Sequence, residues 1–316
     1  MRVLFMGTPD FAVFSLKSLC DNGYTPMAVL CQPDKPKGRG NKMLPPPVKA
    51  FAMEKGITVY QPKTLRDDEF DALLRELDPE VIVVVSYGKI LPKNVLDYPR
   101  YGCVNVHGSL LPKYRGAAPM QRAIMDGESV TGITTMLMNE GLDTGDMLLT
   151  SELPLLETYN FEDVHDKLAE MGADLLLETL KGLEDGTVTP TPQPSDGATY
   201  AAKIEKAELF CDFSMSARDM HNKIRGLSPV PLAYTVNAAG QRIKLVSGSV
   251  VREDGVNADC GKVLSLSDKG DGAIVVACAH GTIAITSVVP EGKGRMTAAE
   301  FIRGRKILVG DILGKI

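Results

Sequence analysis

The sequence predicts an α/β protein in which a doubly wound, mostly parallel sheet precedes a small β-barrel. Apolar runs of strand length alternate with stretches of helical periodicity through the first half of the chain, the pattern of a Rossmann-like core. Residues 81–85 are an unbroken run of valine and isoleucine, typical of a parallel strand buried on both faces. After residue 242, short β-like runs recur at intervals of roughly ten residues, which is typical of a small barrel.

Composition and charge set the broad class. The chain has 316 residues, 44% hydrophobic and 24% charged, enough for two domains. No apolar run approaches the roughly 20 residues of a membrane span and the N-terminal run is too short for a signal peptide, so we expect a cytoplasmic protein, as a monomer. The six cysteines include no Cys-x-x-Cys pair and no histidine at zinc-ligand spacing, so neither disulfides nor a metal are expected.

The charge is unevenly distributed along the chain. Residues 206–316 hold 15 Lys and Arg against 11 Asp and Glu, so that part carries +4 and the first 205 residues carry −9. A basic second part is compatible with a polyanionic partner, although a charge of +4 is common for a domain.

The elements follow from local patterns. Strands are expected in the first domain at residues 2–6, 27–31, 57–60, 81–85, 104–107, 132–138 and 147–149, and helices at 11–19, 67–77, 120–125 and 160–183. The first strand ends at Gly7, but the turn lacks the Gly-x-Gly-x-x-Gly spacing that lets a backbone approach a pyrophosphate, so a nicotinamide dehydrogenase is disfavoured.

Three segments make up the expected domain organisation. Residues 1–189 form the catalytic domain, and residues 190–205, rich in proline and without large apolar side chains at first, form an extended linker. Residues 206–316 form the second domain, with a helix at 217–225 and strands at 243–246, 261–266, 273–278 and 283–289.

Asn105 and His107 are the main candidates for chemistry. They alternate with Val104 and Val106, so on a strand they project from one face with about 6 to 7 Å between their Cα atoms. One small polar group fits between two such donors, as stabilisation of an oxyanion requires. A lone histidine in an apolar strand is more often a core residue. The pair, followed at once by a loop rich in glycine and proline, favours a catalytic role.

The stretch Asn-Val-His-Gly-Ser-Leu-Leu-Pro-x-Tyr-Arg-Gly-Ala-Ala-Pro, beginning at Asn105, resembles the signature of the folate-dependent formyltransferases. The basic loop at residues 32–40, the Gly-Leu-Asp-Thr-Gly-Asp segment at 141–146 and the separate second domain resemble the members of that family that act on methionyl-tRNA. The resemblance implies that a formyl group passes from 10-formyltetrahydrofolate to the α-amine of initiator methionyl-tRNA, without a metal. It also implies that the second domain is an OB-like barrel that binds tRNA.

The resemblance assigns roles to individual residues. Asp143 completes a catalytic trio by orienting the imidazole of His107, while Asn105 and protonated His107 donate to the developing oxyanion from two sides. The folate would be bound by the segment that follows the trio's strand, namely Ser109, Leu110, Leu111 and Pro112, with the loop at residues 87–92 as a further wall of the pterin pocket.

The basic loop is the expected contact with tRNA. Over the stretch from Gln32 to Pro47 the cationic residues are Lys35, Lys37, Arg39 and Lys42, and five prolines are expected to exclude regular structure. The loop is longer than the usual 2 to 6 residues between strand and helix, and long loops in compact domains are commonly functional.

Other functions stay open at this point. A small amine, such as glycinamide ribonucleotide or an amino sugar nucleotide, could be the acceptor, or the chain could be a non-catalytic nucleic-acid-binding protein. A Cys-His acyl transferase is disfavoured because Cys103 and His107 lie about 13 Å apart along a strand. The segment at residues 225–231 lacks a Trp that the family often carries before the last Pro.

Overall fold

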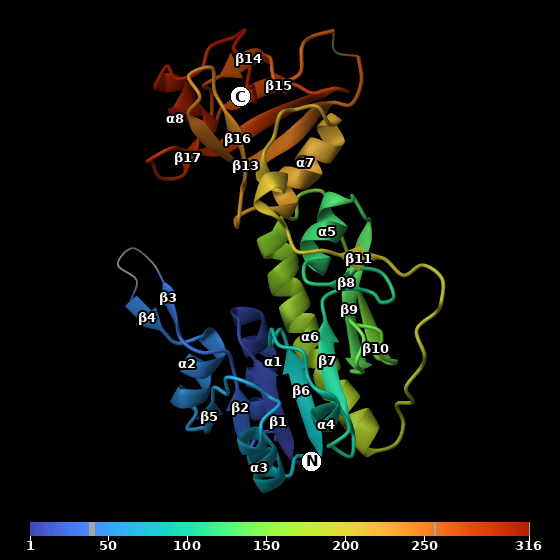
Figure 1. Ribbon diagram of the computed structural model, residues 1–316. Helices are drawn as coiled ribbons and strands as arrows, with labels where there is room; N and C mark the ends of the chain where they lie inside the picture. Colours follow the sequence, from blue (N-terminus) through green and yellow to red (C-terminus); the bar gives the residue numbers. More distant parts are fainter. Residues whose placement is uncertain (38–41, 256, 316) are drawn as a thin grey trace. The chain divides into compact units, whose positions relative to one another are not determined.

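The computed structural model describes residues 1–37, 42–255 and 257–315 (Figure 1). The chain divides into two compact units. Unit 1 consists of Met1–Pro119, Val130–Pro154 and His165–Ala201, and unit 2 of Met120–Ser129, Leu155–Val164 and Ala202–Ile316. No helix in the described part of the chain is both long enough and apolar enough to cross a membrane.

Unit 1 is built on a seven-stranded sheet. Its strand order is β10-β9-β7-β6-β1-β2-β5. The strands from β5 to β7 are parallel, whereas β9 runs antiparallel to β7 and β10 antiparallel to β9. The mostly parallel sheet predicted from the sequence is therefore confirmed. Its strands are β1 (Val3–Gly7), β2 (Ala28–Leu30), β5 (Val59–Tyr60), β6 (Val81–Val85), β7 (Cys103–His107), β9 (Val130–Leu137) and β10 (Met147–Pro154).

Helices cover both faces of this sheet, because alternate apolar side chains leave each strand in opposite directions. On one face, Leu4, Ile82 and Cys103 belong to a buried cluster with side chains of α3 (Asp68–Leu77) and α4 (Lys93–Leu96). On the other face, Gly172 of α6 (Phe161–Glu184) lies so close to Val106 that a Cβ would be 2.9 Å from its Cγ1. Two further helices, α1 (Asp10–Asp21) and α2 (Pro47–Glu54), follow β1 and the basic loop.

The basic loop contains regular structure, so the expectation that its prolines exclude it is wrong. Strands β3 (Lys35–Lys37) and β4 (Lys42–Leu44) form a hairpin that projects from the sheet (Figure 1). A two-stranded ribbon has a free edge on each strand, so Pro36, which lacks an N–H, is accommodated opposite Met43. The base of the hairpin is fixed by Lys49, whose Nζ donates to Asp34 Oδ1 at 2.8 Å.

Part of the expected linker is bound to unit 1. Thr191 forms a β-bridge with Met147, and β11 (Tyr200–Ala201) pairs in parallel with β8 (Arg115–Gly116). Residues 190–201 thus belong to unit 1 and pair with it near both ends. The proposed domain boundaries 1–189, 190–205 and 206–316 stay a prediction.

Unit 2 contains a bent antiparallel sheet with strand order β12-β13-β16-β15-β14, and a short β17 pairs with β16. The separate β domain predicted from the sequence is confirmed. Phe213, Ile224 of α7 and Val276 lie in its core. The bounds are α5 (Pro119–Met125), η1 (Lys206–Leu209), α7 (Ala217–Gly226), β12 (Ala233–Val236), β13 (Arg242–Arg252), β14 (Val263–Ser267), β15 (Ala273–Ala277), β16 (Thr282–Pro290), β17 (Met296–Thr297) and α8 (Ala298–Arg303).

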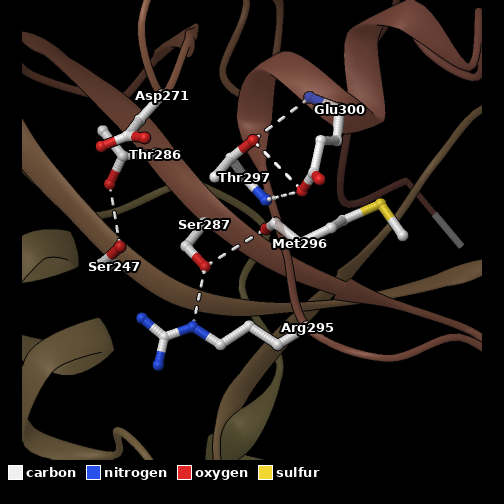
Figure 2. A pocket seen from close by; sticks show the side chains of 8 residues that line it. All are labelled: Ser247, Asp271, Thr286, Ser287, Arg295, Met296, Thr297 and Glu300. Carbon is white, nitrogen blue, oxygen red and sulfur yellow. Dashed lines mark hydrogen bonds between the residues drawn. The ribbon is translucent and has the colours of Figure 1, made fainter.

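A polar pocket of about 380 Å³ lies beside β16 and the start of α8. Figure 2 shows serine and threonine hydroxyls beside charged side chains in its wall: Ser247 and Thr286 are hydrogen-bonded at 2.8 Å, and Arg295 Nε donates to Ser287 Oγ at 3.1 Å. None of the residues predicted to take part in catalysis or ligand binding lines this pocket.

The thiol of Cys103 is buried in the sheet and is expected to be unreactive. Its side chain is 1% exposed, and Sγ donates to the carbonyl of Val95 at 3.5 Å. Burial raises the pKa of this thiol to about 12, so only about one molecule in 10⁴ is a thiolate at pH 8.

We therefore predict that Cys103 resists iodoacetamide in the native protein at pH 8 and reacts once the chain is unfolded in guanidinium. Peptide mass spectrometry after a time course measures this, with the partly exposed Cys20 and Cys260 as internal comparisons. Alkylation of Cys103 as fast as that of Cys20 in the folded protein would contradict its burial.

Candidate active site

Strand β7 places Asn105 and His107 on one face at the carboxyl edge of the sheet. His107 is the last residue of the strand and is 6% exposed, whereas Asn105 is half-buried. Within the part of the chain that the structure describes, the side-chain amide of Asn105 has no hydrogen-bond partner. A side-chain amide that the fold leaves free can donate to a bound group.

The imidazole of His107 is oriented by a backbone carbonyl. Its Nε2 lies 2.9 Å from the carbonyl oxygen of Tyr114. Because a carbonyl only accepts, Nε2 carries the proton and donates. The other nitrogen, Nδ1, faces Asp143 Oδ2 at 3.8 Å, too far for a hydrogen bond. The Tyr114 carbonyl thus holds Nε2 while Asp143 faces Nδ1, and the orienting role expected of Asp143 stays a prediction.

Asp143 lies in the turn between β9 and β10. Its φ of 52° is left-handed, a conformation that costs a non-glycine residue energy unless the surroundings hold it. The amide of Gly116 donates to its Oδ2 at 2.8 Å, and Gln193 Nε2 donates to its carbonyl oxygen at 2.8 Å. The carboxylate is thus fixed beside His107 Nδ1 by contacts from two other segments.

The loop after β7 contains the predicted folate segment. Ser109 Oγ donates to the carbonyl of Lys113 at 2.7 Å, and Thr134 Oγ1 donates to the carbonyl of Ser109 at 2.8 Å. Leu111 is buried, while Leu110 and Pro112 are half-buried. The hydroxyl of Ser109 and the side chain of Leu111 therefore serve the fold itself, which leaves Leu110, Pro112 and the backbone as the accessible parts.

The Tyr87 loop, also predicted to contact folate, follows β6. The Tyr87 ring is fully buried, and burial raises the pKa of its hydroxyl. Its carbonyl oxygen accepts from Thr8 Oγ1 at 3.0 Å and Gln32 Nε2 at 3.1 Å. Tyr87 is therefore a core residue, and Ile90 is an exposed large apolar residue of this loop.

Three of the predicted tRNA-binding cations lie on the strands of the hairpin. Lys35 is an exposed residue of β3, while Lys37 and Lys42 are paired in register where the two strands end. Arg39 lies outside the described residues. The hairpin is anchored by a network in which Lys49 and Gln61 hydrogen-bond to the Asp34 carboxylate, and these bonds lower its pKa.

Three residues of this site were missed in the sequence. His107 and Asp143 are held by the carbonyl of Tyr114, the amide of Gly116 and the side chain of Gln193. Every residue has a backbone carbonyl and almost every residue has an amide, so the sequence does not indicate which of these groups contact the site. Gln193 stands in a proline-rich stretch that has the composition of a linker, so no local pattern identifies it. Among the described residues, no cluster of His, Cys, Asp and Glu could hold a metal.

Comparisons with known proteins give the family. The family described as formyl transferase matches residues 1–180, and that described as formyl transferase, C-terminal domain, matches residues 203–306. A relative from Acetivibrio thermocellus named methionyl-tRNA formyltransferase is 49% identical over 315 residues, which covers 100% of both chains. A relative of the same name from Pelotomaculum thermopropionicum is 46% identical, over 100% of this chain and 99% of its own.

Solved structures share the fold at lower identity. HypX from Aquifex aeolicus in complex with tetrahydrofolic acid has a TM-score of 0.61 at 18% identity and covers 96% of this chain and 47% of that one. An N-formyltransferase from Helicobacter canadensis, in complex with folinic acid and dTDP-3-aminofucose, has a TM-score of 0.62 at 18% identity and covers 90% of this chain and 98% of that one. Both units match family models and full-length relatives, so the chain belongs to the formyl transferase family.

Proposed function

We propose that this chain transfers the formyl group of 10-formyltetrahydrofolate to the α-amine of methionyl-tRNA. The observation that carries the chemistry is the meeting of Asn105, His107 and Asp143 at the carboxyl edge of the sheet. The acceptor follows from the full-length relatives named methionyl-tRNA formyltransferase, at 44–49% identity.

The reaction needs a neutral amine, a stabilised oxyanion and a path for one proton. The amine nitrogen attacks the formyl carbon, a C–N bond forms, and the carbonyl oxygen becomes an oxyanion. The free amide of Asn105 donates to that oxygen, as does Nδ1–H of His107 when the ring is protonated. The bond from carbon to N10 then breaks, and the proton lost by the amine goes to N10.

Asp143 acts on this cycle through His107. Its carboxylate faces Nδ1 at 3.8 Å, beyond hydrogen-bond range, so Nδ1–H of the protonated ring stays free to reach the substrate. The Tyr114 carbonyl prevents the ring from rotating to place Nε2 there instead. In this arrangement no covalent intermediate with the protein is required.

The folate would lie against the loops that follow β6 and β7. The half-buried Leu110 and Pro112 offer an apolar wall, and the exposed Ile90 offers another. Support for a folate co-substrate comes from the relatives of known structure that were solved with tetrahydrofolic acid and folinic acid.

The tRNA would be bound by the β3–β4 hairpin and by residues 206–316 of unit 2, the more basic part of the sequence. Lys35, Lys37 and Lys42 belong to the strands of the hairpin, and Arg39 stands between them in the sequence. Phosphate contacts by such side chains supply affinity without reading sequence.

A small amine is the second candidate acceptor, because a sugar N-formyltransferase from Shewanella sp. shares the fold. That relationship has a TM-score of 0.61 at 21% identity and covers 78% of this chain, so it supports the architecture only. A small acceptor also gives no reason for a projecting basic hairpin. A non-catalytic role is disfavoured because Asn105, His107 and Asp143 are all present and brought together.

We predict that Asn105→Ala lowers kcat by about 10²- to 10³-fold, the cost of removing one oxyanion donor. His107→Ala should lower kcat by about 10²- to 10⁴-fold, and Asp143→Asn should lower it as well. Single-turnover formylation of methionyl-tRNA measures the chemical step, and equilibrium titration with the folate should find unchanged affinity. Cys103→Ser, on the same strand face, is the matched control and should keep kcat within about threefold.

Near-normal turnover of any trio variant would remove that residue from the mechanism. A large loss of kcat in Cys103→Ser, with the protein still folded, would revive a covalent thiol mechanism.

For the hairpin, we predict that Arg39→Ala and Lys42→Ala each lower kcat/KM for methionyl-tRNA. Each cation that meets a phosphate should contribute roughly 0.7 to 0.9 to the slope of log affinity against log salt concentration. Titrations at several salt concentrations measure that slope, and the affinity for folate serves as the control, since the hairpin would hold only the acceptor.

An unchanged kcat/KM and salt slope in the Arg39→Ala, Lys42→Ala double variant would mean that the hairpin is a solvated surface. The tRNA contacts would then have to come from unit 2.

A further inference from the structure

Residues 191–201, named here the strap, run along the active-site loops within unit 1. At one end Thr191 bridges to Met147, and at the other β11 pairs with β8. Between them, Thr199 Oγ1 accepts from the amide of Tyr114 at 2.9 Å, and the carbonyl of Thr199 accepts from the amide of Arg115 at 2.9 Å. The strap therefore supports the residue whose carbonyl orients His107.

Gln193 is the strap residue that touches the other side of the site. Its Nε2 donates to the carbonyl oxygens of Asp143 and Gly145, both at 2.8 Å. Its Oε1 accepts from the Nε of Arg115 at 3.0 Å and from one Nη at 2.6 Å. Both hydrogens of the amide and its oxygen are thus used, and the contacts join the Asp143 turn to the loop that contains Gly116.

The same two segments are joined a second time through the carboxylate. Gly116 donates its amide to Asp143 Oδ2 at 2.8 Å. Gly116 itself is held close to the strap, since a Cβ there would lie 2.8 Å from the carbonyl oxygen of Ala201, and its φ is 118°. Gln193 therefore hydrogen-bonds to the backbone of Asp143, and Gly116 hydrogen-bonds to its side chain.

We propose that Gln193 is a positioning residue for the reaction, acting through Asp143. The left-handed backbone of Asp143 is unfavourable on its own, and two hydrogen bonds from one rigid amide hold that turn in place. Without them, the turn relaxes and the carboxylate shifts relative to Nδ1 of His107. The inference rests on the proposed function of the trio.

Two substitutions separate the contacts of Gln193. Gln193→Glu keeps an oxygen for the Arg115 guanidinium but faces the carbonyls of Asp143 and Gly145 with a carboxylate, whereas Gln193→Ala removes both contacts. If the role runs through Asp143, both variants should lower kcat by about 10- to 100-fold, the scale of a misplacement of about 1 Å. The KM values for folate and methionyl-tRNA should stay within about threefold, since no substrate contact is removed.

A double-mutant cycle tests the route of the effect. In an Asp143→Ala background, adding Gln193→Ala should cause no further loss of kcat, because the group being positioned is already gone. The inference would be overturned if the kcat of the double variant fell by the product of the two single losses. It would also be overturned if Gln193→Glu kept the wild-type kcat.

The matched control is Asn22→Asp. Asn22 is an exposed residue whose Nδ2 donates to the carbonyl of Ser18 at 2.8 Å at the end of α1. Since α1 runs back from the carboxyl edge of the sheet, this end lies at the opposite edge from His107. The change from amide to carboxylate is the same as in Gln193→Glu, and kcat should be unchanged.

A measurement independent of activity keeps the two proposals distinguishable. Amide hydrogen exchange in residues 141–146 and at Gly116 should quicken in both Gln193 variants and stay unchanged in Asn22→Asp, at equal melting temperature. If the wild-type protein fails to formylate methionyl-tRNA, the proposed function fails while the exchange result still tests the grip on Asp143. Unchanged exchange in the Gln193 variants would overturn that grip.

Discussion

The hydrogen bond from the Gly116 amide to the Asp143 carboxylate joins the two loops on which the site depends. The loop after β7 carries the carbonyl of Tyr114 that orients His107, and the turn after β9 carries the carboxylate that faces Nδ1. A sheet fixes only where loops begin. Contacts between the loops fix the distance between their side chains. The reaction is sensitive to that distance, because the negative charge develops on an oxygen that must lie within reach of two donors.

The two ring nitrogens of His107 have different neighbours in this arrangement. A carbonyl holds Nε2, so the ring cannot turn, while the carboxylate lies just beyond hydrogen-bond range of Nδ1. A tight bond between Asp143 and Nδ1 would occupy the proton that the oxyanion needs. The separation places the carboxylate beside the ring without that competition.

Local pattern was enough to predict the sheet. The β-branched run at residues 81–85 predicts a strand, and these residues form β6. All five side chains are buried, because a central parallel strand is covered on both faces. The pairing of Asn105 with His107 also followed from strand periodicity. The hairpin β3–β4 was missed, because the one proline in its strands, Pro36, lies in a two-stranded ribbon with free edges, where it costs little. Gln193 was missed because its partners lie 48 to 78 residues away, and a contact at that separation leaves no trace in local composition.

The trio accounts for formyl transfer to an amine in general, so the choice of acceptor is the claim most in need of a direct test. The wild-type protein should be incubated with 10-formyltetrahydrofolate and, separately, methionyl-tRNA, glycinamide ribonucleotide and an amino sugar nucleotide, and kcat/KM should be measured for each acceptor. Our account predicts rapid formation of N-formylmethionyl-tRNA and negligible formylation of the two small amines. Faster formylation of either small amine than of methionyl-tRNA would contradict it.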